Sequence, residues 1–262
     1  RAAARPSSDQ EPCGYHSRDV ATRIQRRSRI EERIVVAIEE REIHSRHNFA
    51  RSLPDGVPSR AMLSLTWRHP DLGSIEPEEF MPLASHSGLN EAMLRLALQE
   101  ANAFANGSLG AGLPVGVHLT TSQFEDSTTL HVLASHLRER DKNLPPLQLI
   151  IPEAAIGADI GTAIIMLREM RELGAILVLE NFGAGFASLP DLARLPIDAA
   201  AIDASIIAGL ERNASDRALV EAYIHMAHSL DIRVIATGVS TQAELKQLME
   251  FGCDEGMGPL WQ

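Results

Sequence analysis

Residues 172–189 read ELGAILVLENFGAGFASL, and this stretch decides the fold that we expect of the chain. Its apolar run, 175–179, has the length of a buried strand, and a glycine-rich turn follows it. The carboxylate of Glu180 and the amide of Asn181 stand between the two. In a parallel α/β barrel, residues directly after the strands form the active site. Because an amide binds metals weakly and cannot act as a base, the stretch predicts an enzyme scaffold that lacks part of its chemistry.

The same theme, an apolar strand followed by an amphipathic helix, recurs along the chain, as expected for βα units. We expect strands at 61–65, 115–119, 147–151, 175–179, 199–202 and 234–236. We expect helices at 90–104, 130–140, 160–173, 216–230 and 243–249, where apolar residues recur at three- and four-residue spacing. Thr241 and Glu244 have the spacing of a capping box before the last helix. Successive units without a GxGxxG or phosphate loop favour an α/β fold of the closed-barrel type over an open doubly wound sheet.

Length and composition limit the possible functions. A chain of 262 residues that is 45% hydrophobic can bury one large core, with at most a short appendage. Its formal charge of −11 argues against nucleic-acid polymers and anionic membranes as partners. Cys13 and Cys253 lack the spacing of a zinc site or a disulfide framework, and no apolar run is long enough to span a bilayer. Since the sequence begins with Arg1, we expect a cytoplasmic piece of a longer protein whose membrane anchor, if there is one, lies elsewhere.

The N-terminal segment differs from the rest. Residues 1–18 are rich in Arg, Ser and Pro and predict a linker or the tail of an upstream domain. Residues 19–40 predict an amphipathic helix, which either docks on the main domain or connects it to an upstream domain. The apolar stripe of this helix consists of Val20, Ile24, Ile30, Ile34 and Ile38. The barrel is then expected to occupy 41–262.

The side chains that directly follow the expected strands form a sparse catalytic set. They are His118, Pro152 with Glu153, Glu180 with Asn181, Asp203, and Thr237. Metal-dependent phosphodiester hydrolysis needs several converging carboxylates, whereas the acids here are spread over separate strand ends. If the chain is an enzyme, its metal site must be built from His118, Glu153, Glu180 and Asp203.

Several segments, in this order, resemble the EAL family of bacterial cyclic di-GMP phosphodiesterases. They are WRHPDLGSIEPEEFMPLA from Trp67, VGVHLTTSQF from Val115, LQLIIPEA from Leu147, ENFGAGFASLPDLARLPIDAAAID from Glu180, and ATGVSTQAEL from Ala236 with FGCDEGMGPL after it. The resemblance implies a modified (β/α)8 barrel with one antiparallel strand, and magnesium or manganese as the family's cofactor. It also implies a GGDEF-type domain upstream and dimerisation through the glycine-rich loop.

Residue by residue, however, the resemblance implies that most of the family's functional residues are replaced in this chain. The glutamate of the EAL signature falls on Met62, the phosphate-contacting arginine on Thr66, and a strand-end asparagine on His118. The metal-binding glutamate of the next strand falls on Ile150. A second glutamate of that motif, which organises a neighbouring loop, is kept as Glu153.

The second half of the barrel shows the same trend. The family's paired aspartates become Glu180 and Asn181. The lysine that assists the attacking water becomes Ala201, although Asp203 beside it is kept. Three further positions of the ligand pocket, which the family fills with a glutamine, a glutamate and a glutamine, fall on Asn48, Thr237 and Met257.

These substitutions predict a degenerate, catalytically inactive EAL-like domain with a regulatory role in cyclic di-GMP signalling. We expect it to hold no cofactor and to act on a protein partner, an upstream GGDEF-type domain or a second copy of itself. Two alternatives remain open, a non-hydrolytic cyclic di-GMP receptor and a residual phosphodiesterase with a relocated metal site. We expect little cyclic di-GMP binding, because Thr66 and Ala201 replace cations that would neutralise its phosphates.

Overall fold

The structure is a computed structural model that describes residues 13–110, 112–157, 159–183 and 189–261. Most of the predicted linker, residues 1–12, therefore lies outside the described residues, as do 184–188 of the glycine-rich loop. None of the described helices combines the length and the hydropathy needed to cross a lipid bilayer.

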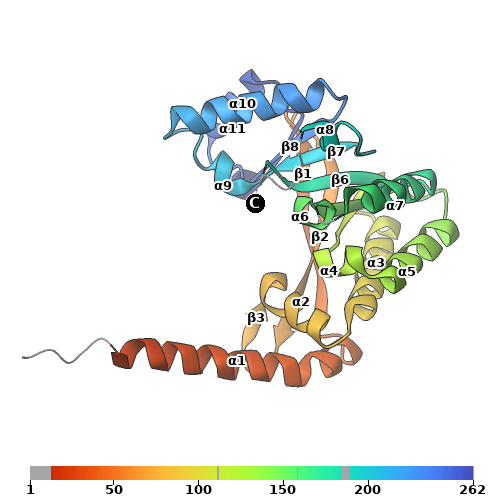
Figure 1. The fold of residues 1–262 in the computed structure, drawn as a ribbon, viewed down its shortest axis with the longest axis vertical. Helices are drawn as coiled ribbons and strands as arrows, with labels where there is room; N and C mark the ends of the chain where they lie inside the picture. The colour runs from red at the N-terminus through yellow and green to blue at the C-terminus, as the bar shows by residue number, and fades with distance from the viewer. Residues whose placement is uncertain (1–12, 111, 158, 184–188, 262) are drawn as a thin grey trace, which may run out of the picture.

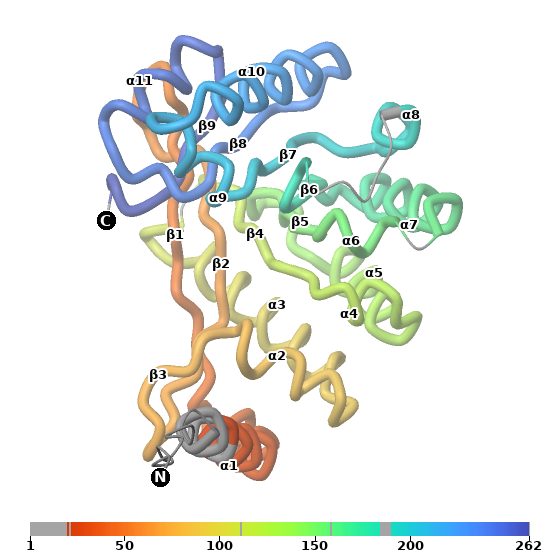
Figure 2. Tube along the Cα trace, turned by 60° about the vertical axis from the view of Figure 1, so that its left-hand side comes forward, coloured from red at the N-terminus to blue at the C-terminus, as the bar shows by residue number. Residues whose placement is uncertain are grey.

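Helix α1 (Cys13–Glu39) covers the helix predicted at 19–40 and begins earlier, at Cys13. Its Ile30, Ile34 and Ala37 are buried against the rest of the chain. In Figures 1 and 2 it lies at the end of the molecule beside β3 (Gly73–Ile75) and α2 (Pro77–His86). The helix is thus docked on the main domain through one apolar face, and a role as connector stays a prediction.

The strands form a closed barrel. Most strands pair in parallel with their neighbours around the barrel. In order, they are β2 (Pro58–His69), β4 (Val115–His118), β5 (Leu147–Pro152), β6 (Ile176–Phe182), β7 (Ala199–Ile202), β8 (Arg233–Thr237) and β9 (Glu255–Met257). Strand β1 (Ile43–Ser52) pairs antiparallel with both β2 and β9 and so closes the sheet. The modified (β/α)8 barrel with one antiparallel strand is confirmed.

Most helices cover the outside of this barrel (Figure 1). They are α3 (Asn90–Asn106), α4 (Thr121–Glu125), α5 (Ser127–Glu139), α6 (Glu153–Ile156), α7 (Ile160–Glu172), α8 (Leu189–Leu192), α9 (Ala204–Ile207), α10 (Ala214–His228), α11 (Gln242–Glu250) and the 3-10 helix η1 (Pro259–Trp261). The capping box predicted for the last helix is present: Thr241 Oγ1 accepts from Glu244 N at 3.0 Å, and Glu244 Oε2 accepts from Thr241 N at 3.1 Å.

The described residues bury two apolar cores. The larger core lies between the strands and the outer helices. The smaller core, which we call the interior cluster, consists of Ala50, Met62, Ile150, Val178, Ala199, Ala201 and Ile235, with Ile176 and Met257 packed against it. Because side chains alternate between the two faces of a strand, these residues fill the inside of the barrel.

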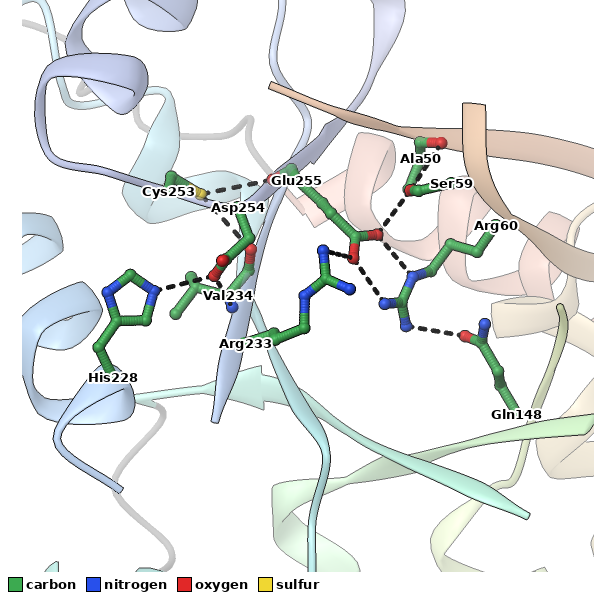
Figure 3. A network of polar contacts seen from close by, with 10 residues as sticks. All are labelled: Ala50, Ser59, Arg60, Gln148, His228, Arg233, Val234, Cys253, Asp254 and Glu255. Carbon is green, nitrogen blue, oxygen red and sulfur yellow. Dashed lines mark hydrogen bonds and ion pairs between the residues drawn. The ribbon is translucent and has the colours of Figure 1, made fainter. Parts of the chain in front are cut away.

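An ion-pair network with a buried centre, which we call the floor network, joins β2, β5, β8 and β9 at the ends where these strands begin (Figure 3). Arg60, at the start of β2, donates to both carboxylate oxygens of Glu255 on β9 at 2.6 Å. It also donates to Gln148 Oε1 on β5 at 3.0 Å, and Arg233 on β8 reaches Glu255 Oε1 at 3.0 Å. Glu255 is fully buried, so its charge depends on these partners.

Candidate functional site

The interior cluster occupies several positions where the family resemblance places charged or polar ligands. Met62, Ile150 and Ala201 are almost completely buried in it, and Met257 packs against it. Strand β4 leaves room for two of these side chains at Gly116, where a Cβ atom would lie 2.7 Å from Ile150 Cδ1 and 3.0 Å from Met62 Sδ. Positions expected to carry two glutamates, a lysine and a glutamine therefore meet as one apolar cluster.

His118 and Glu180 lie next to each other at the carboxyl ends of β4 and β6. His118 Nδ1 is 3.2 Å from Glu180 Oε1, and each side chain is about one third exposed, at 36% and 31%. The two side chains face the same cavity. Among the site residues predicted from the sequence, these two present polar groups to a cavity that is large enough to hold a ligand.

Glu153, by contrast, is buried and contacts the backbone of Gly183, directly after β6. Its Oε2 accepts a hydrogen bond from Gly183 N at 3.0 Å. Gly183 has a φ of +94°, and Tyr223 lies so close that a Cβ atom there would come within 2.6 Å of its ring. The left-handed φ and this close contact together favour glycine at the position, and the loop-organising role of Glu153 stays a prediction.

Of three other predicted site residues, Asp203 and Thr237 form local structural contacts and Asn181 occupies a special backbone conformation. Asn181 is exposed and adopts a left-handed φ of +58°, a conformation that asparagine tolerates better than most residues. Asp203 caps α9, its Oδ1 accepting from Ser205 N at 2.8 Å. Thr237 Oγ1 donates to the Ile202 carbonyl at 2.8 Å.

The remaining two lie on the β1–β2 ribbon. Asn48 faces Met62 in the β1–β2 register and is partly buried. Thr66 is buried, with its Oγ1 3.4 Å from Ser74 Oγ. A threonine hydroxyl there cannot supply the positive charge of the arginine that the resemblance expects.

The relocated metal site considered from the sequence is not assembled. His118 and Glu180 are together, but Glu153 bonds to the Gly183 amide and Asp203 caps a helix. Within the described ranges, no three His, Cys, Asp or Glu side chains are grouped so that they could hold a metal ion. The described residues at the barrel mouth do not fit the family's divalent cation, which takes several oxygen ligands.

A cavity of about 650 Å³ lies at the mouth of the barrel, and we call it the mouth cavity. It is bounded by α2, α3 and α4, by the middle of β2 and by the ends of β4, β5 and β6. Of the sequence-predicted site residues, only His118, Glu180 and Pro152 line it. No sequence pattern predicts the contribution of α2, because that helix reaches the mouth only through the tertiary fold.

Comparisons with known proteins agree with this geometry. The EAL domain family model matches residues 50–262. The cyclic di-GMP phosphodiesterase PA2567 of Pseudomonas aeruginosa is 30% identical over 79% of this chain and 36% of its own length. NbdA of the same organism, also named a cyclic di-GMP phosphodiesterase, is 28% identical over 94% of this chain and 32% of its own length. The chain thus spans about a third of these curated relatives.

A solved structure is similar over the barrel. The PaMucR phosphodiesterase, determined as a complex with c-di-GMP, superposes with a TM-score of 0.80 at 27% identity. The match covers 88% of this chain and 95% of that one. The similarity therefore extends over nearly the whole described domain.

Proposed function

Because this chain belongs to the EAL domain family, we propose that it is a catalytically inactive, regulatory member of bacterial cyclic di-GMP signalling that acts through a protein partner. The observation that carries the proposal is the interior cluster. Met62, Ile150 and Ala201 are buried together where the resemblance expects two glutamates and a lysine.

The physical argument concerns both metal and water. Mg²⁺ and Mn²⁺ prefer oxygen ligands, and the apolar atoms of Met62 and Ile150 supply none. A hydrolytic water also needs a group that takes its proton, and Ala201 offers no such group. Loss of one catalytic group typically lowers a rate by about 10²- to 10⁴-fold, so several losses leave little catalysis.

A receptor that binds cyclic di-GMP without cleaving it is the second candidate. The presence of a cavity at the mouth of the barrel favours it, and PaMucR has been solved with that nucleotide. Against it, no described residue that lines the mouth cavity is Arg or Lys, although a ligand with two phosphates needs neutralising charge. A residual phosphodiesterase with a relocated metal site is the third and least supported candidate.

We also propose that the chain works within a larger cytoplasmic protein. The curated relatives are about three times longer than the matched region, since it covers 36% and 32% of them. MucR of Pseudomonas aeruginosa carries the name of a bifunctional diguanylate cyclase and cyclic di-GMP phosphodiesterase. An upstream GGDEF-type domain is accordingly the partner that we expect first, with α1 as the connection; a second copy of the chain is the other.

Calorimetric titration with cyclic di-GMP tests the proposal. The chain is titrated in magnesium, in manganese and in chelator, and the nucleotide is analysed afterwards for cleavage. We expect neither heat nor cleavage. Binding without cleavage would establish the receptor, and metal-dependent cleavage would show that the ligands have been relocated.

A further inference from the structure

The mouth cavity has the size and the floor of a small-molecule site. At about 650 Å³ it falls within the range of about 300 to 1,000 Å³ that is usual for ligand pockets. Its floor is formed by buried apolar side chains, namely Leu63, Leu65, Met93, Ala97 and Leu119. Methionines at the floor and on α2, Met93 and Met81, adapt to differently shaped apolar groups. Such a floor favours a ligand with an apolar body.

The charges around this floor are of one sign. Glu78 and Glu125 stand exposed at the rim, and Glu180 lies half-buried in the wall. The cationic residues Arg and Lys are absent from the described lining. Two histidines, His86 and His118, also line the cavity. An anion entering this cavity meets repulsion, and a cation meets attraction.

Glu180 is the group that could pair with a bound cation. Oxygen Oε1 lies 3.2 Å from His118 Nδ1, and within the described part of the chain its carboxylate has no second side-chain partner. The side chain is 31% exposed, so it is shielded from much of the solvent yet open to the cavity. A charge-assisted contact is stronger in such a place than at a fully exposed surface.

We propose that the mouth cavity binds a small organic cation with an apolar body, whose ammonium group pairs with Glu180. The inference rests on the proposed function, in which the mouth cavity does not bind cyclic di-GMP and the domain is regulatory. It names the class of ligand that the cavity would bind instead. The apolar body lies on the buried floor between α2 and α3, and the rim carboxylates Glu78 and Glu125 attract the cation to the entrance.

Three probes that share one skeleton separate charge from shape. Tryptamine is cationic at pH 7, 3-ethylindole is neutral, and indole-3-propionate is anionic. In calorimetric titrations of the whole chain, we expect tryptamine to bind about tenfold more tightly than 3-ethylindole, as one charge-assisted contact predicts. We expect indole-3-propionate to bind more weakly than both.

Two variants locate the site, and one serves as control. Glu180→Gln should weaken tryptamine about tenfold, to the level of 3-ethylindole, and leave 3-ethylindole unchanged. Ser64→Phe places a large side chain from the half-buried wall into the cavity and should weaken all three probes. Glu221→Gln removes the same charge from the exposed surface of α10 and should change no affinity more than about twofold. Cooperative thermal unfolding of each variant shows that it is folded.

The inference is overturned if indole-3-propionate binds as tightly as tryptamine, if no probe binds at millimolar concentration, or if Glu180→Gln behaves like Glu221→Gln. Cyclic di-GMP is titrated in parallel and analysed for cleavage. Its binding or cleavage would overturn the proposed function and this inference together. Failure of tryptamine while cyclic di-GMP stays unbound and intact would overturn this inference alone.

Discussion

At the scale of the residue, Ile150 is the position at which the inactive reading can be tested most directly. It is 1% exposed and packs with Met62 over Gly116. Ile150→Glu would restore the glutamate that the resemblance expects, but the charge would be buried among apolar side chains. We expect a loss of about 3 to 5 kcal/mol in the free energy of unfolding at pH 7 and no phosphodiesterase activity.

Urea unfolding at pH 7 and pH 4 measures this effect. Burial raises the pKa of a carboxylic acid, so the folded variant takes up a proton at a higher pH than the unfolded chain does. The penalty should therefore shrink as the pH falls toward 4. Ile150→Met, which nearly conserves volume, should cost less than about 1.5 kcal/mol at either pH. A stable Ile150→Glu protein that gains stability from Mg²⁺ would show that a metal site persists.

Cys253 gives a second residue-scale prediction. Burial raises the pKa of its thiol to about 12, so the reactive thiolate is scarce near neutral pH. In a Cys13→Ser background, we expect Cys253 to react with a disulfide reagent at pH 8 at least about 100-fold more slowly in the folded protein than in urea. Reaction at equal rates in both states would show that the region around β9 opens easily.

At the scale of the element, α1 tests which forces dock a helix on this barrel. Arg26 and Glu79 join α1 to α2 by two hydrogen bonds, but both side chains are more than one third exposed. Such pairs contribute about 0 to 1 kcal/mol. Ile34 is fully buried, and its truncation to alanine should cost about 2 to 5 kcal/mol.

Urea unfolding of three variants separates these contributions. Ile34→Ala should lower the free energy of unfolding most, and Arg26→Ala should lower it little. Ile24→Ala changes a side chain that is 62% exposed, so its free energy of unfolding should stay within about 0.5 kcal/mol of the parent value. Equal effects of Ile34→Ala and Ile24→Ala would mean that α1 does not dock through its buried face.

His47 of β1 predicts how stability depends on pH. Its ring stacks on Phe104 of α3 at 4.2 Å, and its Nε2 is buried without a partner among the described residues. Burial lowers the pKa of this histidine below 6.5, and nearby Glu100 offsets the effect only in part. The unfolded chain therefore binds the proton more readily, and stability is lost as the pH falls below about 6.5.

We expect His47→Phe to keep the stacking and to flatten the fall in unfolding free energy between pH 7 and 5. Burial also lowers the pKa values of His69 and His136, so part of the slope should remain. His131→Phe, at an exposed position on α5, serves as the control and should leave the slope unchanged. An unaltered slope in His47→Phe would contradict the assignment.

The elements also show what the sequence can and cannot predict. Strands β5 to β8 could be located because their apolar runs are continuous, as in parallel strands that are buried on both faces. Strand β1 reads IHSRHNFARS and could not be predicted, because its polar and apolar residues neither alternate nor form an apolar run. It is a strand because it hydrogen-bonds to β2 and β9, which is a tertiary property.

The candidate site divides in the same way. The substitutions at Met62, Ile150 and Ala201 were visible one by one, through the family resemblance. That they pack as one cluster follows from the barrel register, which a single sequence does not give. The mouth cavity could be predicted still less, since it combines α2 with His118 of β4 and Glu180 of β6, which lie far away in the chain.

At the scale of the whole molecule, the floor network connects strands that are distant in sequence and closes the end of the barrel opposite the mouth. Glu255 has no exposure and meets Arg60, Arg233 and Ser59 (Figure 3). Glu255→Gln would leave the buried Arg60 without its counter-charge, so we expect a loss of about 3 to 5 kcal/mol in unfolding free energy. Urea unfolding measures it. Arg233→Ala removes a half-exposed partner and should cost much less.

A double variant decides whether the attraction between Arg60 and Glu255 stabilises the barrel by more than the burial of the two charges costs. Replacing both partners, as Arg60→Met with Glu255→Leu, removes the cost of desolvating two charges, and well-packed apolar replacements are often neutral or stabilising. We expect the double variant to recover most of the stability that Glu255→Gln loses. If it is as unstable as Glu255→Gln, the hydrogen bonds that tie β2 to β5 and β9 are required to hold the barrel closed.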